Sequence, residues 1–150
     1  MANAKIGSQT SWNQNYVETI TTTKQLERGD SGKVFMIDNT VAHTINLPKL
    51  SSEIAGWNCK MIVSVNGAAD VSVVGYGLPA AGGTTSDNDL VHYREIPLAD
   101  EAGAVNLNQD GFTIAAATII TDSFEIFSDG TSWFVEALVH EIAHSAPIDS

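Results

Sequence analysis

The sequence predicts an all-β, single-domain fold, a β-sandwich or barrel of jelly-roll-like architecture. Three observations support this: short apolar segments alternate with polar residues at period two, turn signals separate them, and only one helical turn is expected, at residues 51–56. The 150 residues suit one domain. We expect an N-terminal arm at 1–16, a β domain at 17–139 and a C-terminal tail at 140–150.

The first strands follow a polar, unpatterned arm. Residues 17–23 are rich in Thr and β-branched side chains, which favours a strand. A turn cluster at 28–32 precedes the next expected strand, 33–38. Residues 41–47 then alternate until Pro48, which cannot donate a hydrogen bond to a β-ladder and therefore ends the strand.

The clearest strand covers residues 57–65, directly after the expected helical turn with its serine start and glycine stop. Its apolar phase includes Cys59, the only cysteine, which we interpret as a small core residue rather than a redox group. Asn66–Gly67 is a strong turn signal, and a short strand follows at 71–74.

The second half contains a glycine-rich loop at 75–89, a weaker strand at 90–98 and further strands at 104–107 and 112–120. Two final strands are predicted to form a hairpin on a two-residue Asp129–Gly130 loop. These strands cover residues 124–128 and 131–139. Five aromatic residues in strand patterns are expected in the core: Phe35, Trp57, Phe124, Trp133 and Phe134.

The charge is strongly asymmetric. The net charge is −11, with +1 over residues 1–60 and −12 over residues 61–150, where Arg94 is the only cation. This balance disfavours nucleic acid and anionic membranes as partners. It is consistent either with one acidic face and one nearly neutral docking face, or with a plain acidic surface.

No apolar segment of the sequence has the length of a membrane helix or the position of a secretory signal. We therefore expect synthesis in a reducing cytoplasm.

The string His140-Glu141-Ile142-Ala143-His144 matches the zinc-peptidase pattern. That chemistry requires a helix carrying both imidazoles, a third ligand and a cleft. Residues 133–139 read as a strand, and only six residues follow His144. We therefore expect no enzyme and no cofactor. A weak metal site at His140 and His144, or remotely a zinc hydrolase, remains the alternative.

Three further motifs have plainer interpretations. Arg28-Gly29-Asp30 matches an adhesion tripeptide but is also good turn chemistry. The glycines of the 75–89 loop lack the Lys-Ser/Thr of a phosphate loop. Asp87-Asn88-Asp89 offers calcium ligands but lacks the glycine of an EF-hand loop, which favours a solvated loop tip.

Two aromatic residues, Trp12 and Tyr16, lie in the polar arm. They either anchor the arm on a neighbouring surface or pack back on the arm's own domain. We also consider Lys5, Lys24 and Arg28 as partners for acids on a binding protein.

Two stretches together resemble small β-rich virion proteins of tailed bacteriophages, in particular capsid decoration (cement) proteins and tail-fibre modules. They are residues 30–65, with Asp30-Ser31-Gly32-Lys33-Val34-Phe35-Met36-Ile37-Asp38, Ile45-Asn46-Leu47-Pro48 and Gly56-Trp57, and residues 124–139. The resemblance implies a homotrimer that clamps the major capsid protein from the outer capsid surface after synthesis in the host cytoplasm. The alternative is a tail-fibre or receptor-binding module with a glycan-binding surface groove lined by the 75–89 loop.

Overall fold

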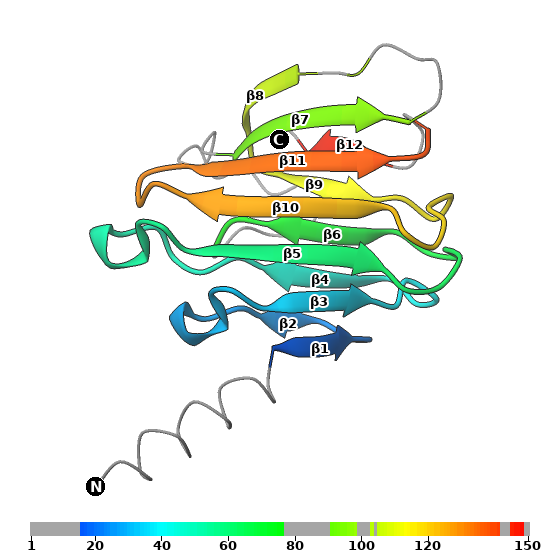
Figure 1. Cartoon of the computed structure of the whole chain (residues 1–150), viewed down its shortest axis with the longest axis horizontal. Coiled ribbons are helices and arrows are strands. Elements are labelled where there is room, and N and C mark those ends of the chain that lie inside the picture. The colour runs from blue at the N-terminus through cyan, green and yellow to red at the C-terminus, as the bar shows by residue number, and fades with distance from the viewer. Residues whose placement is uncertain (1–15, 77–90, 99–102, 104, 142–144, 149–150) are drawn as a thin grey trace, which may run out of the picture.

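The structure is a computed structural model that describes residues 16–76, 91–98, 103, 105–141 and 145–148. Its strands form two stacked sheets, which confirms the all-β sandwich, and neither sheet closes into a barrel (Figure 1). The seven-stranded sheet has the order β1 (Val17–Ile20), β3 (Val34–Ile37), β5 (Asn58–Val63), β10 (Ser123–Ser128), β11 (Trp133–Val139), β7 (Val91–Pro97) and β8 (Val105–Gln109). The five-stranded sheet has the order β12 (Ser145–Ile148), β9 (Gly111–Ile114), β6 (Val71–Val74), β4 (His43–Asn46) and β2 (Lys24–Gln25).

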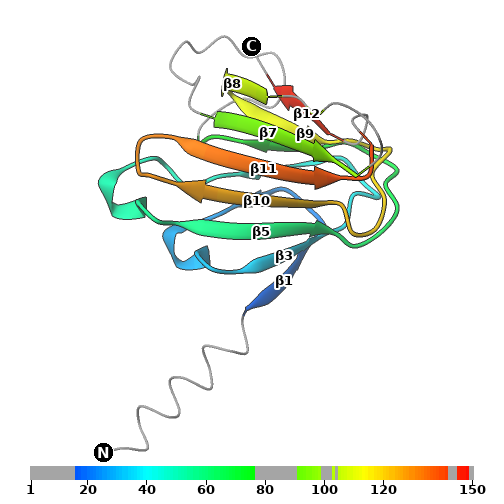
Figure 2. The ribbon, with the colours of Figure 1, turned by 45° about the horizontal axis from the view of Figure 1, so that its top comes forward.

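The first six strands alternate between the two sheets, so that the chain winds as a flattened coil (Figure 2). Within each sheet these strands pair with one another in parallel. Across the described residues, five of the ten strand pairs are parallel, which distinguishes this sandwich from an antiparallel jelly roll. Single 3₁₀ turns, η1 (Arg28–Asp30) and η2 (Ser52–Ile54), lie between strands, and η2 matches the one expected helical turn.

The core lies between the sheets and is built on aromatic pairs. Phe112 of the five-stranded sheet stacks on Tyr93 and Phe124 of the other sheet, with ring centroids 5.6 and 5.1 Å apart. Trp57 and Trp133 meet edge to face at 5.2 Å. Four of the five aromatic residues expected in the core are fully buried. Cys59 is also buried, as expected, and burial raises the pKa of its thiol.

Three expectations about the second half were wrong in detail. The hairpin loop has four residues rather than two, because Ser128 pairs with Trp133 and the Asp129 carboxylate accepts the backbone N–H groups of Thr131 and Ser132. The strand expected at 112–120 ends at Ile114, where the chain turns. Part of the expected tail forms β12, which pairs with β9.

The turn after β9 contains a strained residue. Thr121 is exposed and has φ +89°, a conformation that a β-branched residue rarely adopts. Replacing it with Gly is expected to stabilise the protein by about 1 kcal/mol, because relief of strain exceeds the entropy that glycine gains in the unfolded chain. Thermal unfolding measures this as a rise of roughly 2–4 °C.

The control for this prediction is Ala117→Gly in the same turn. Ala117 is also exposed, but its φ is not positive, so glycine relieves no strain there. The variant should lower stability by about 0.5–1 kcal/mol, because only the entropy that glycine gains in the unfolded chain remains. A melting temperature of Thr121→Gly that falls as far as that of Ala117→Gly would contradict strain at Thr121.

Candidate interaction surface

The outer faces of the two sheets differ in chemistry. On the five-stranded sheet, register aligns the small polar residues Thr44, Ser72 and Thr113 in one row. On the seven-stranded sheet, eight outward positions that alternate with core residues are apolar: Val17, Val34, Met36, Ile62, Ile96, Phe127, Phe134 and Leu138. A solvated sheet face is normally polar, so the seven-stranded face is the candidate interaction surface.

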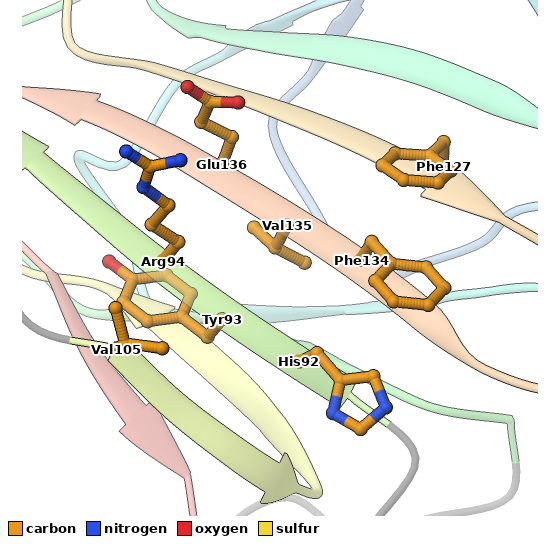
Figure 3. Close-up of a pocket in the computed structure, with 8 residues that line it drawn as sticks. All are labelled: His92, Tyr93, Arg94, Val105, Phe127, Phe134, Val135 and Glu136. Atoms are coloured by element: carbon orange, nitrogen blue, oxygen red, sulfur yellow. The ribbon is translucent and has the colours of Figure 1, made fainter.

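An aromatic row crosses three strands of this surface. Register places Phe127, Phe134 and His92 next to one another on β10, β11 and β7 (Figure 3). The two Phe rings stack at 4.9 Å, and His92 lies 5.1 Å from Phe134. Phe127 is 52% exposed. A hollow of about 200 Å³ opens beside the row, and Arg94 and Glu136 line it (Figure 3).

A charged row lies next to the aromatic one. Register orders it as Lys60, Glu125, Glu136 and Arg94 across four strands. Lys60 donates to Glu125 at 3.0 Å, and both side chains are solvent-exposed. Such a pair contributes less than about 1 kcal/mol to stability, so its main effect is to set the charge pattern of the surface.

A second hollow, of about 330 Å³, lies at the other end of the aromatic row. Phe127 forms one wall, Tyr16 lies at the opposite side, and Gly32 and Asn58 lie between them. Tyr16 is 53% exposed. The two hollows therefore flank Phe127 on one sheet face.

The expected partner-binding residues differ in their exposure and in their contacts. Tyr16 lines the second hollow. Lys24 is engaged in an ion pair with Glu18 and lies over the Phe35 ring. Arg28 is exposed and pairs with Glu53 at 3.2 Å. Trp12 and Lys5 lie outside the described residues.

In the folded Arg28-Gly29-Asp30 tripeptide, the Asp30 carboxylate is already engaged by groups of the same chain. Asp30 is buried, accepts the Glu27 N–H at 2.9 Å and pairs with Lys33 at 2.6 Å. An adhesion receptor would need that carboxylate accessible, so this geometry favours the turn interpretation.

Asp30→Asn should remove the charge of this buried group and lower stability at neutral pH by about 1–2 kcal/mol. Burial alone would raise the Asp30 pKa, but the Lys33 ammonium and the Glu27 N–H outweigh it and hold the pKa below its ordinary value of 3.8. The stabilisation is therefore present above pH 3.8 and lost as pH falls through the lowered folded-state pKa. Urea unfolding at several pH values should show wild type and variant converging in acid. Glu53→Gln, which breaks only the exposed Arg28 pair, should change stability by less than about 0.5 kcal/mol.

The histidine string follows β11 rather than a helix. His140 and Glu141 are exposed, and the His140 N–H donates to the Asp122 carboxylate at 2.8 Å. Two further parts of the chain lie outside the described residues: His144, and residues 77–89 of the glycine-rich loop, which include Asp87-Asn88-Asp89. Within the described ranges, no group of three or more His, Cys, Asp or Glu could hold a metal ion. The same residues contain no helix long and apolar enough to cross a membrane.

A buried polar chain joins the C-terminal strand to the other sheet. The Tyr93 hydroxyl donates to the Ser145 hydroxyl, which donates to the Glu95 carboxylate at 2.6 Å. All three residues are buried, and burial raises the Tyr93 pKa so that its hydroxyl remains a donor. These hydrogen bonds therefore link β12 to β7 inside the sandwich.

Sequence reasoning missed the aromatic row. Phe134 was expected in the core, but it lies half-buried on the outer face, and that expectation was wrong. The available signal was phase: Phe127 shares its outward phase with Glu125, and Phe134 shares its phase with Glu136.

No protein-family model matches the chain, and no curated protein matches it.

Proposed function

We propose that this chain is a non-catalytic structural protein of a tailed-phage virion, a capsid decoration protein that binds the outer face of the major capsid shell. The observation that carries the binding role is the set of apolar side chains, among them Phe127, Phe134 and Leu138, on the outer face of the seven-stranded sheet. The aligned row Thr44, Ser72 and Thr113 on the five-stranded sheet is polar instead. The sequence resemblance over residues 30–65 and 124–139 supports the virion assignment.

The proposed stabilisation of the shell is mechanical. Each copy buries apolar side chains against capsid subunits, at about 25 cal/mol per Å² removed from water. A homotrimer would multiply these contacts through effective concentration, without any single strong site. The charge order across the sheet, cation, two anions, cation, would set the orientation of the bound copy.

The test uses undecorated shells assembled from the major capsid protein of the same virion. Purified chain should bind them saturably and raise their melting temperature, because a ligand that binds only the folded shell stabilises it. Absence of binding at low salt contradicts the proposal. Sedimentation of the free protein measures whether it is a trimer.

A second candidate is a tail-fibre or receptor-binding module. It is favoured by the hollow where Phe134, His92, Arg94 and Glu136 meet, since apolar walls with a few polar groups are typical of small-ligand sites. A glycan array distinguishes the two candidates. Glycan binding that Phe134→Ala abolishes, without shell binding, would select this one.

A further inference from the structure

We propose that two copies of this chain pack face to face through their seven-stranded sheets, about a twofold axis that runs parallel to the strands between β11 and β7. In this dimer Glu136 of each copy pairs with Arg94 of the other. The inference concerns the free chain. The dimer covers the face proposed to bind the shell, so it has to open before attachment, and the homotrimer would then assemble on the shell rather than in free solution.

The register of the two central strands provides the evidence. β11 and β7 are parallel neighbours, and their outward residues lie side by side at three levels: Phe134 beside His92, Glu136 beside Arg94, and Leu138 beside Ile96 (Figure 3). The first level is aromatic on both strands and the third is apolar on both. The middle level combines an exposed anion with an exposed cation. Each level therefore has matching chemistry on the two strands.

A twofold axis between these strands turns that match into a contact between copies. It places β11 of one copy over β7 of the other, and an axis parallel to the strands keeps every residue at its own level. Glu136 then faces Arg94 and Leu138 faces Ile96, and each contact forms twice because the interface is isologous. Two sheets that stack in this way lie about 10 Å apart with their strands nearly aligned, a common packing geometry.

The neighbouring axes give poorer matches. An axis between β10 and β11 would place Glu125 opposite Glu136 twice, and like charges facing each other disfavour association. An axis between β5 and β10 would pair Lys60 with Glu125, but would set the polar Asn58 against Phe127. With the axis between β11 and β7, Glu125 lies at the rim, opposite the edge strand β8, and keeps Lys60 of its own chain as its partner.

The area around this axis suits a reversible dimer. The strands β10, β11, β7 and β8, at about 4.8 Å per strand and 3.3 Å per residue, cover a face of about 20 by 20 Å in each copy. Two such faces approach the roughly 1,200 Å² at the lower limit of stable interfaces. We therefore expect a dissociation constant in the micromolar range.

Reversing the charges tests the contact. Arg94→Glu and Glu136→Arg each place like charges opposite one another twice, so each variant should weaken the dimer by about 100-fold or more. An equimolar mixture of the two variants should dimerise again, because one chain then presents two anions and the other two cations. Such restoration arises only from a contact between chains. Sedimentation velocity across the micromolar range measures all three samples.

Lys60→Glu is the matched control for net charge. It changes the charge as much as Arg94→Glu, but β5 lies two strands away from β11, beyond the contact. It should change the dissociation constant by less than about threefold at physiological salt. Thermal melts establish that the variants remain folded, because Arg94 and Glu136 are both exposed.

Three results would overturn the proposal. The first is a wild-type chain that stays monomeric at the highest concentration or forms a trimer in free solution. The second is a dimer that either single variant leaves as stable as in the wild type. The third is a mixture of the two variants that stays monomeric. Shell binding is measured separately, so the dimer and the virion function can each fail without the other.

Discussion

Leu138→Asp is expected to weaken binding to undecorated shells by about 100-fold or more, the effect typical of losing an interface hot spot. Leu138 lies on β11 and is 39% exposed, next to Ile96 in the register. The new carboxylate would lie in the apolar part of the proposed interface, on the same strand face as Glu136, and would lose its water on binding. The measurement is a binding isotherm by co-sedimentation with shells.

The matched control for this prediction is Ser72→Asp. It also introduces a carboxylate on the outer face of a strand with neighbours on both sides, but in the five-stranded sheet. Both variants should have similar, slightly lowered stability, whereas only Leu138→Asp should lose binding. Equal loss in the two variants would show that negative charge, rather than the apolar face, governs attachment. Unchanged binding by Leu138→Asp would remove the sheet face from the proposed interface.

Ser145→Ala is expected to destabilise the protein by about 3 kcal/mol, because it leaves the Tyr93 hydroxyl and the Glu95 carboxylate without their shared hydrogen-bond partner in a buried site. For a domain of this size the melting temperature should fall by roughly 6–12 °C. Loss of this link should also free β12 from the sandwich and expose the edge of β9 to rapid amide exchange.

A double-mutant cycle with Tyr93→Phe tests whether these residues act as a unit. The double variant should be more stable than the sum of the two single effects predicts, since one lost contact is counted twice. Ser72→Ala, a serine on the outer face, should change stability by less than about 0.5 kcal/mol and serves as the control. A melting temperature of Ser145→Ala within about 1 °C of wild type would contradict a fastening role for Ser145.

The outer-face chemistry of β11 shows the limit of pattern reading. In this strand both phases are rich in apolar residues: Val135, Ala137 and Val139 in one, Phe134 and Leu138 in the other. Period-two alternation gives the two faces of a strand but not which face meets the other sheet. The aromatic row became visible only once register placed Phe127 beside Phe134.

The coil of the first six strands was hidden for a different reason. Its parallel partners Val17, Val34 and Lys60 are separated by 17 and 26 residues, so no fixed period appears in the sequence. The last strand was missed because Ser145–Ile148 is short and contains Pro147. This strand depends on two long-range contacts: its pairing with β9 and the hydrogen bond from the buried Ser145 hydroxyl to Glu95.

The sequence by itself determined the all-β class, the approximate positions of the strands and most of the buried aromatic residues, because strand periodicity and turn chemistry are local. Only the tertiary structure decided the strand order, the parallel pairing and the apolar face that the seven-stranded sheet leaves open. Those features depend on which distant segments pair and on which of two apolar phases turns inward, and a chain reveals neither until its sheets are stacked.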